Sequence, residues 1–178
     1  MGKSILVSGG TRSGKSDFAL QRAEQLSGTH CFIATCPVVD EEMAERIEKH
    51  RRVRNSSIWK TVEEQFAVAE LIAGNDYDVY LVDCLTLWIN NLLAQCAAKN
   101  LDCDEPFVSS QVKRLLDTVG SIDATVIFVT NEVGMGIVPK NALARRYRDL
   151  VGLCNRLIGV AAEEVILVSC GLPLYLKK

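Results

Sequence analysis

The 178-residue sequence lacks the features of several large classes of protein. No apolar run approaches about eighteen residues without a charge, the length that a transmembrane helix requires, so we expect no membrane span. The 20 lysines and arginines do not outnumber the 22 aspartates and glutamates, and the net charge of −2 excludes an overall basic field for nucleic acid. The chain enters an apolar segment at once, without a cleavage-site pattern, so we expect no signal peptide.

Cysteine spacing and aromatic content exclude further classes. The seven cysteines form no Cys-x-x-Cys pair, so we expect reduced thiols in a cytoplasmic protein, with neither a disulfide framework nor a zinc site. Aromatic residues are only 6% of the chain, which argues against a nucleic-acid motor of this size and charge. What the chain does contain, 48% hydrophobic and 24% charged residues, is typical of a globular protein with a core.

Apolar runs rich in β-branched residues alternate with segments of helical periodicity. Such runs, separated by helices, are typical of a parallel sheet covered on both faces. We therefore expect an α/β, P-loop NTPase-like fold with a mostly parallel sheet, forming a single nucleotide-binding domain over residues 1–178. The expected strands span residues 4–8, 31–35, 58–61, 79–83, 125–130 and 164–169. The expected helices span residues 17–26, 40–54, 62–72, 85–98, 106–119 and 141–162.

A phosphate-binding motif follows the first expected strand. Glycines let successive backbone N–H groups surround a phosphate, and the following helix contributes its positive N-terminal end. Lys15 would reach the β- and γ-phosphates of ATP or GTP, and the Ser16 hydroxyl would hold Mg²⁺. The alternative, a glycine-rich turn that binds nothing, is disfavoured by the flanking strand and helix. The residues that match G-x-x-x-x-G-K-[ST] are Gly9, Gly10, Thr11, Arg12, Ser13, Gly14, Lys15 and Ser16.

A carboxylate ends another expected strand. Asp83 follows the apolar run of residues 79–82, so it would lie at the carboxyl edge of a parallel sheet, beside the glycine-rich loop. There it would share the Mg²⁺ with Ser16. The alternative is a structural aspartate that caps the following helix.

One of the two histidines lies in a strongly basic segment. Residues 46–54 contain five cations and one anion around His50. Neighbouring cations disfavour the protonated imidazole, and a neutral imidazole is a nucleophile. The same arginines would bind a triphosphate and its leaving pyrophosphate. The alternative is a solvated basic face of a helix. His30, at the entry to a strand, is expected to be structural.

Several blocks of sequence resemble one enzyme family. With these blocks the chain resembles the bifunctional adenosylcobinamide kinase / adenosylcobinamide-phosphate guanylyltransferases of cobalamin biosynthesis. The phosphate loop is shared by very many enzymes, whereas the blocks around His50 and after Thr130 are specific to this family. The blocks occur in the family's order between residues 5 and 171, at 9–16, 33–35, 40–50, 59–63, 81–91, 130–139 and 145–155.

The resemblance implies two reactions in one protein. ATP or GTP phosphorylates the hydroxyl of adenosylcobinamide. GTP then guanylylates a histidine, which corresponds to His50, and the GMP passes to the phosphorylated substrate. The resemblance also implies a homotrimer. Besides the phosphate loop, it implies nucleotide contacts from Ala34, Thr35, Cys36, Arg51, Arg52, Val53, Arg54, Glu63 and Asp83.

Two of these positions depart from the family pattern. Asp83 stands where the family often has the longer glutamate, and Cys36 stands where a small polar residue is usual. We also expect the charged segment 40–54 to move as a helix, because attack at the γ-phosphorus and attack at the α-phosphorus need different placements of the nucleotide.

Other readings stay open at this point. Asn131, Glu132 and three arginines on the following helix (Arg145, Arg146 and Arg148) would line the corrinoid or phosphate side of the cleft, or else form a turn and a solvated face. A simple P-loop small-molecule kinase would leave His50 without a role. A GTP-dependent switch is disfavoured because the segment from Thr130 lacks an Asn-Lys-x-Asp motif.

Overall fold

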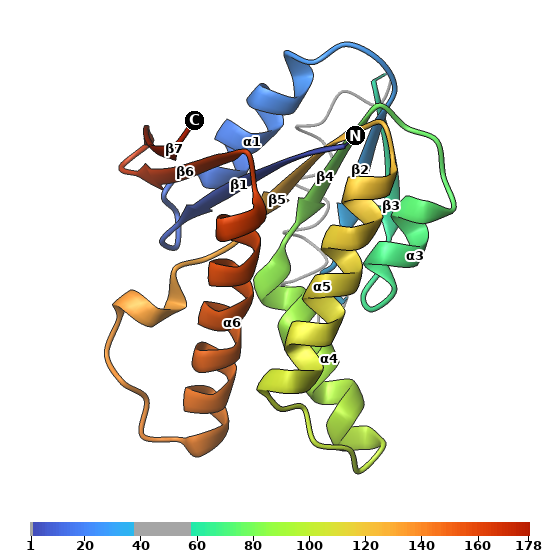
Figure 1. Ribbon diagram of the computed structural model, residues 1–178. Coiled ribbons are helices and arrows are strands. Elements are labelled where there is room, and N and C mark those ends of the chain that lie inside the picture. The colour runs from blue at the N-terminus through green and yellow to red at the C-terminus, as the bar shows by residue number, and fades with distance from the viewer. Residues whose placement is uncertain (1, 38–57) are drawn as a thin grey trace.

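The computed structural model describes residues 2–37 and 58–178, and these residues form a seven-stranded sheet with helices on both faces (Figure 1). The strand order is β3-β2-β4-β5-β1-β6-β7, parallel throughout except that β7 runs antiparallel to β6. The strands are β1 (Lys3–Gly9), β2 (His30–Ala34), β3 (Trp59–Glu63), β4 (Val79–Asp83), β5 (Thr125–Val129), β6 (Glu164–Ser169) and β7 (Leu172–Lys177). The helices are α1 (Lys15–Glu24), α3 (Val68–Ala73), α4 (Leu85–Ala98), α5 (Glu105–Ser121) and α6 (Ala142–Ala161), with a 3-10 turn η1 (Val133–Met135).

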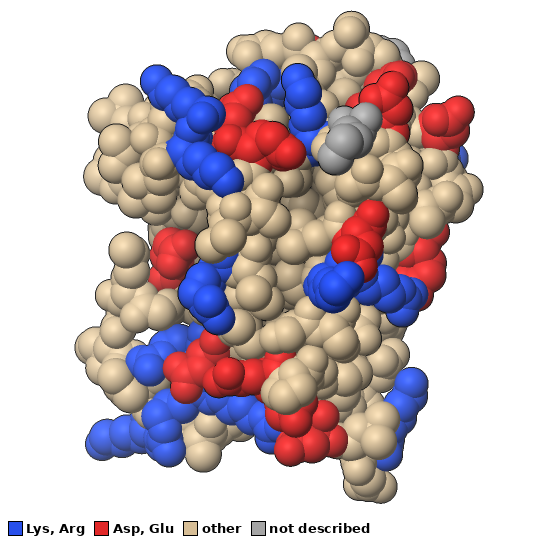
Figure 2. Space-filling model, in the orientation of Figure 1, with Lys and Arg blue, Asp and Glu red and all other residues tan. Residues whose placement is uncertain are grey.

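The two faces of the sheet are covered by different helices. Alternate residues of a strand point to opposite faces, so Ile5 and Val7 of β1 pack with α1 while Leu6 packs under the other helices. Helices α3, α4, α5 and α6 share the Leu6 face, and α1 lies across the sheet from α5 and α6 (Figure 1). Figure 2 shows basic and acidic side chains interspersed on one side of the molecule, in keeping with the small net charge.

The strand order places three loops side by side. Because β4, β5 and β1 are neighbours in a parallel sheet, their carboxyl ends lie at one edge. The segments that follow these strands begin at Gly10, Cys84 and Thr130. Ligands of open α/β sheets bind at this edge, where the chain direction of successive crossovers changes.

Most of the expected elements are confirmed, but the expected helix over residues 62–72 is wrong in its first half. Val62 and Glu63 extend β3, pairing with Ile33 and Ala34 of β2. The Glu64 carboxylate then accepts hydrogen bonds from the backbone N–H groups of Phe66 and Ala67, both at 2.8 Å, so the helix begins only at Val68. The expected helix over residues 40–54 lies outside the described residues.

The sequence analysis missed β7. This strand forms a hairpin with β6 through Cys170 and Gly171, whose φ angles of 53° and 79° are those of a tight turn with a left-handed backbone. Cysteine is not a typical residue for that conformation, so only Gly171 of the two turn residues indicates a turn in the sequence. Among the described residues, none of the helices is long and apolar enough to cross a membrane.

Candidate active site

The glycine-rich loop between β1 and α1 wraps back on itself. The carbonyl oxygen of Gly10 accepts hydrogen bonds from the Ser13 backbone N–H and the Lys15 ammonium, both at 3.2 Å. Gly14 has a φ of 90° and its carbonyl accepts the first helical hydrogen bond, from Phe18 at 2.9 Å. The lysine therefore lies folded over the loop, at the N-terminal end of α1, where positive charge for an anionic ligand is concentrated.

Close packing around Gly9 explains why a glycine is required there. A Cβ atom at this position would lie 2.4 Å from the carbonyl oxygen of Val168 and 2.6 Å from the Ser13 hydroxyl. Ser13 is 8% exposed, and within the described part of the chain its hydroxyl has no hydrogen-bond partner. A buried polar group without a partner is rare and suggests an absent partner, such as a phosphate oxygen.

The loop opens on a cleft of about 510 Å³ at the carboxyl edge of the sheet. Asp83, at the end of β4, lines this cleft together with Ser16 and Lys15, so the structure brings together the residues expected to act on phosphate and metal. Ala34 and Cys36 line it as well. The remaining lining residues are Thr11, Arg12, Ser13, Gly14, Asp17, Phe32, Cys84, Thr86, Leu87, Asn131 and Tyr147.

Four of the expected nucleotide contacts among the described residues, Gly9, Gly10, Thr35 and Glu63, do not line this cleft. Thr35 is fully buried, and its hydroxyl donates to the Cys84 carbonyl at 2.7 Å and accepts from the Cys84 backbone N–H at 2.8 Å. It therefore holds the segment that follows Asp83. Glu63 ends β3 beside Ala34 in the ladder and is absent from the cleft lining.

Two weakly acidic side chains of the cleft, a thiol and a phenol, stay protonated at neutral pH. Burial raises the pKa of the Cys84 thiol to about 11, and the adjacent Asp83 carboxylate adds to the increase. Burial also raises the pKa of Tyr147 to about 12. Since a thiolate or phenolate is the reactive form, neither side chain is suited to act as a nucleophile.

A hydrogen-bonded network joins the lining residues Thr86, Asn131 and Tyr147. The Tyr147 hydroxyl donates to the Thr86 carbonyl at 3.2 Å, and the Asn131 amide donates to the Thr86 hydroxyl at 3.3 Å. Asn155 of α6 donates to the Asn131 carbonyl at 3.1 Å and accepts from the Thr130 hydroxyl at 2.7 Å. The Asn131 side-chain oxygen is buried without a partner among the described residues. The sequence analysis did not identify Thr86 or Tyr147 as lining residues, although both lie in the blocks that resemble the family.

Three arginines in the first half of α6, Arg145, Arg146 and Arg148, do not line the cleft and are bonded to other protein groups. Arg145 donates to the carbonyls of Pro139 at 2.9 Å and Lys140 at 2.6 Å. Arg148 lies against Asp149.

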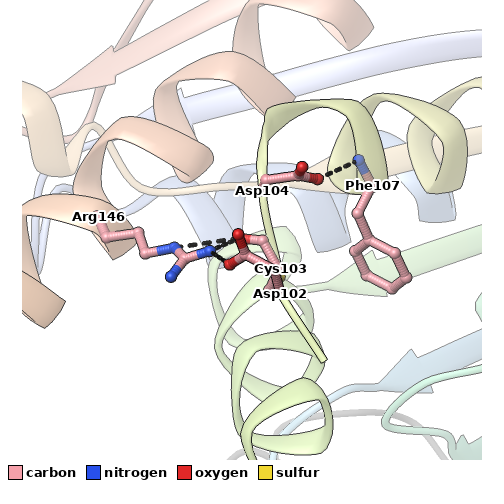
Figure 3. A network of polar contacts seen from close by, with 5 residues as sticks. All are labelled: Asp102, Cys103, Asp104, Phe107 and Arg146. Atoms are coloured by element: carbon pink, nitrogen blue, oxygen red, sulfur yellow. Dashed lines mark hydrogen bonds and ion pairs between the residues drawn. The ribbon is translucent and has the colours of Figure 1, made fainter. Parts of the chain in front are cut away.

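Arg146 ties α6 to the connection between α4 and α5. Its guanidinium lies against the Asp102 carboxylate and donates to the Cys103 carbonyl at 2.8 Å (Figure 3). In the same connection, the Asp104 carboxylate accepts from the Phe107 N–H at 2.9 Å and caps α5 (Figure 3). The hydrogen bonds of Arg146 to Asp102 and Cys103 therefore direct its side chain toward the Asp102–Asp104 segment.

Of the two histidines, only His30 lies in the described part of the chain. His30 is 5% exposed, donates from Nε2 to the Ala23 carbonyl at 3.1 Å and packs edge-on against Trp59, which confirms a structural position. His50 and the four residues expected to contact the nucleotide after it, 51–54, lie outside the described residues, and their roles stay predictions.

Comparison with known proteins gives a consistent family match. The model of the family described as cobinamide kinase / cobinamide phosphate guanyltransferase matches residues 5–176. The bifunctional adenosylcobalamin biosynthesis protein CobU of Escherichia coli K12 is 39% identical over 184 residues, covering 97% of this chain and 99% of its own length. CobP of Pseudomonas aeruginosa PAO1, which carries the same bifunctional description, is also 39% identical and is covered over 96% of its length.

Solved structures show the likeness of the fold alone. An ATPase of a type III secretion system from pathogenic bacteria superposes with a TM-score of 0.63 at 13% identity, over 98% of this chain and 57% of its own. The assembled ATPase EscN from enteropathogenic E. coli gives a TM-score of 0.59 at 11% identity, over 95% of this chain and 43% of its own. The expected α/β, P-loop NTPase-like fold is confirmed.

Proposed function

Since the chain belongs to the cobinamide kinase / cobinamide phosphate guanyltransferase family, we propose that it catalyses both reactions on adenosylcobinamide. In the first, the substrate hydroxyl takes the γ-phosphoryl group of ATP or GTP. In the second, the resulting phosphate takes GMP from GTP, giving adenosylcobinamide-GDP and pyrophosphate. The observation that carries the proposal is the formed phosphate loop, which opens on the same cleft as Asp83.

The kinase step uses the residues at the carboxyl edge of the sheet. Lys15 neutralises charge on the β- and γ-phosphates, and the backbone N–H groups of the loop hold the phosphate oxygens. The Ser16 hydroxyl and the Asp83 carboxylate are hard oxygen ligands in one cleft, so they fit Mg²⁺, which would neutralise phosphate charge when bound. Thr35 positions the backbone next to Asp83.

The transfer step needs a nucleophile, and the family resemblance assigns this role to His50. Cys84 and Tyr147 are held protonated, which supports His50 in this role. A neutral imidazole nitrogen of His50 attacks the α-phosphorus of GTP, the bond to pyrophosphate breaks, and a nitrogen–phosphorus bond forms. A phosphate oxygen of the phosphorylated substrate then attacks the same phosphorus, and the imidazole leaves with its electron pair.

Further nucleotide contacts are proposed by the same resemblance. Ala34, Cys36 and the phosphate loop reach the nucleotide from the described part of the cleft. Glu63 and the arginines after His50 complete the set. We place the enzyme in the cytoplasm, because the described cysteines form no disulfide, and we take it to be a homotrimer on the basis of the family resemblance.

A simple P-loop kinase is the alternative, and the full-length match to bifunctional relatives favours the two-step enzyme. Incubation with GTP labelled at the α-phosphate and Mg²⁺ separates the two readings. We expect label on the protein that is stable to base and lost in acid, as for a phosphoramidate of histidine. The His50→Asn variant should take no label while still phosphorylating adenosylcobinamide.

The chain offers a matched control in its other histidine. His30→Gln, normalised to the amount of folded protein, should keep the label because His30 lies in the core beside Trp59. Label that persists in His50→Asn, or no label in the wild-type protein, would refute the guanylyl-histidine step.

A further inference from the structure

The loop between η1 and the start of α6 presents large apolar side chains to solvent. Ile137 is 94% exposed and Met135 is 78% exposed, and Val138 and Leu143 are exposed as well. We call these four residues the apolar loop face. In Figure 2, the margin where this loop runs beside α6 in Figure 1 shows uncharged surface in its upper part and basic side chains at its lower end. Grouped apolar side chains in water cost solubility, so a contiguous set of them marks a binding surface.

Both stems of this loop belong to the cleft described above. Asn131, at the start of the loop, and Tyr147, one turn beyond Leu143, line the cleft and are joined through Thr86. The loop that carries the apolar loop face therefore begins and ends beside the cleft in which phosphoryl transfer is proposed.

The loop is held in place at both ends. Arg145 fixes its second half by hydrogen bonds to two consecutive carbonyls, those of Pro139 and Lys140. The Asn141 side chain caps α6 by accepting from the Ala144 N–H at 3.1 Å. Val133 packs against the core, and Asn155 holds the Asn131 carbonyl. An anchored loop loses little conformational entropy when a ligand covers it.

The size of the cleft decides where a large acceptor must lie. A volume of about 510 Å³ is that of a site for a single drug-sized ligand, so the nucleoside triphosphate of the proposed function would fill it. The acceptor proposed above carries its reactive hydroxyl on a flexible arm, whereas its macrocycle is broad, with methyl groups and methylene-bearing arms at its edge. The arm enters the cleft, and the macrocycle stays outside, against the adjoining surface.

We propose that the apolar loop face binds the corrin ring of adenosylcobinamide. This inference rests on the proposed function and adds the residues that hold the acceptor. Met135 and Ile137 cover apolar parts of the ring, while Asn131 and Tyr147 lie where the arm enters the cleft. A second copy of the chain is the competing occupant, and the test separates the two.

The test compares Met135→Ser and Ile137→Ser with Val160→Ser. Val160 is an equally exposed apolar residue, 75%, on the same helix that follows the loop, about 25 Å along α6 from Leu143. For each variant we would measure the dissociation constant of adenosylcobinamide by equilibrium dialysis, the KM of the nucleotide, self-guanylylation with GTP alone, and the mass in solution.

The proposal predicts at least a tenfold weaker binding of adenosylcobinamide in Met135→Ser and Ile137→Ser, which is about 1.4 kcal/mol. Nucleotide KM, self-guanylylation and mass should match Val160→Ser and the wild type. Unchanged acceptor binding would overturn the proposal, and so would a changed mass with parallel losses in all assays, which would identify a subunit contact.

Failure of the proposed function gives a different result. A wild-type protein that binds adenosylcobinamide but phosphorylates nothing would count against the function, while the dialysis series would still decide the role of the loop. Wild-type protein that does not bind adenosylcobinamide at all would overturn the loop assignment.

Discussion

Single residues of the phosphate loop are selected by backbone contacts as much as by a ligand. Gly9 and Gly10 are adjacent in the motif but differ in their surroundings. A Cβ at Gly9 would meet a backbone carbonyl at 2.4 Å, whereas one at Gly10 would meet nothing within 4 Å among the described residues. Packing within the protein therefore requires a glycine at position 9, whereas a glycine at position 10 would be required only by the ligand.

Gly9→Ala should lower the free energy of unfolding of the nucleotide-free protein by about 1–3 kcal/mol, because the carbonyl of Val168 has to move. Gly10→Ala, the control, should stay within about 1 kcal/mol of the wild type. Urea unfolding without nucleotide measures both. Equal losses in the two variants would mean that the close approach at Gly9 is not what fixes the loop.

Thr35 acts on the site through the backbone of Cys84. Thr35→Val keeps the shape but leaves the buried Cys84 N–H without its acceptor, so we expect a loss of about 1–3 kcal/mol and a higher KM for the nucleotide. Thr35→Ser restores the hydroxyl and should recover most of both. A Thr35→Val enzyme with an unchanged nucleotide KM would show that this contact does not position Asp83.

At the scale of elements, the β6–β7 hairpin supports the phosphate loop. The backbone N–H of Gly171 donates to the Ser13 carbonyl at 2.9 Å, and Gly171 lies against Gly14. The turn residues Cys170 and Gly171 both have positive φ. The hairpin therefore links the C-terminal strand to the nucleotide site.

Cys170→Asn should stabilise the protein by a few tenths of a kcal/mol to about 1 kcal/mol, because asparagine adopts positive φ more readily and Asn-Gly is the favoured turn pair. Gly171→Val should destabilise it and raise the KM of the nucleotide, since a branched side chain is strained at a φ of 79°. Thermal unfolding and nucleotide kinetics test both. A Gly171→Val enzyme with wild-type nucleotide KM would contradict the link.

Some elements of the fold could be predicted from the sequence pattern, whereas others could not. An apolar strand such as Val79–Asp83 and a helix such as α4 were predicted with correct bounds, because periodicity and flanking residues agree there. β7 was missed because Cys170 does not look like a turn residue. The switch from β3 to a helix was misplaced because it depends on Glu64 accepting two backbone bonds.

The candidate site was predictable only in part for a similar reason. The phosphate loop and Asp83 follow from a motif and a strand end. Thr86 and Tyr147 line the cleft because tertiary packing brings the start of α4 and the first half of α6 together beside the carboxyl end of β4. No local sequence pattern predicts that packing. The structure likewise turns Arg146 toward Asp102, a partner 44 residues away in the chain.

For the whole molecule, buried thiols predict how stability depends on pH. Burial raises the pKa of Cys84 to about 11 and that of Cys154 to about 12, from 9.0. A raised pKa means that the folded state favours the protonated thiol. The stabilisation is complete below pH 9 and is lost as the pH rises through 11 and 12.

Urea unfolding at a series of pH values checks this. The free energy of unfolding should show no loss from these thiols below pH 9 and should fall above it. Cys84→Ser, which does not titrate in this range, should show a shallower fall. An equally steep fall in that variant would mean that Cys84 does not contribute.

For the whole enzyme, we propose that one chain first phosphorylates its acceptor and then transfers GMP to it. The most direct measurement is the mass of the products after incubation of the protein with adenosylcobinamide, GTP and Mg²⁺. We predict adenosylcobinamide phosphate at early times, followed by adenosylcobinamide-GDP together with pyrophosphate. Accumulation of the phosphate with no GDP adduct at any time would contradict the account and leave a kinase alone.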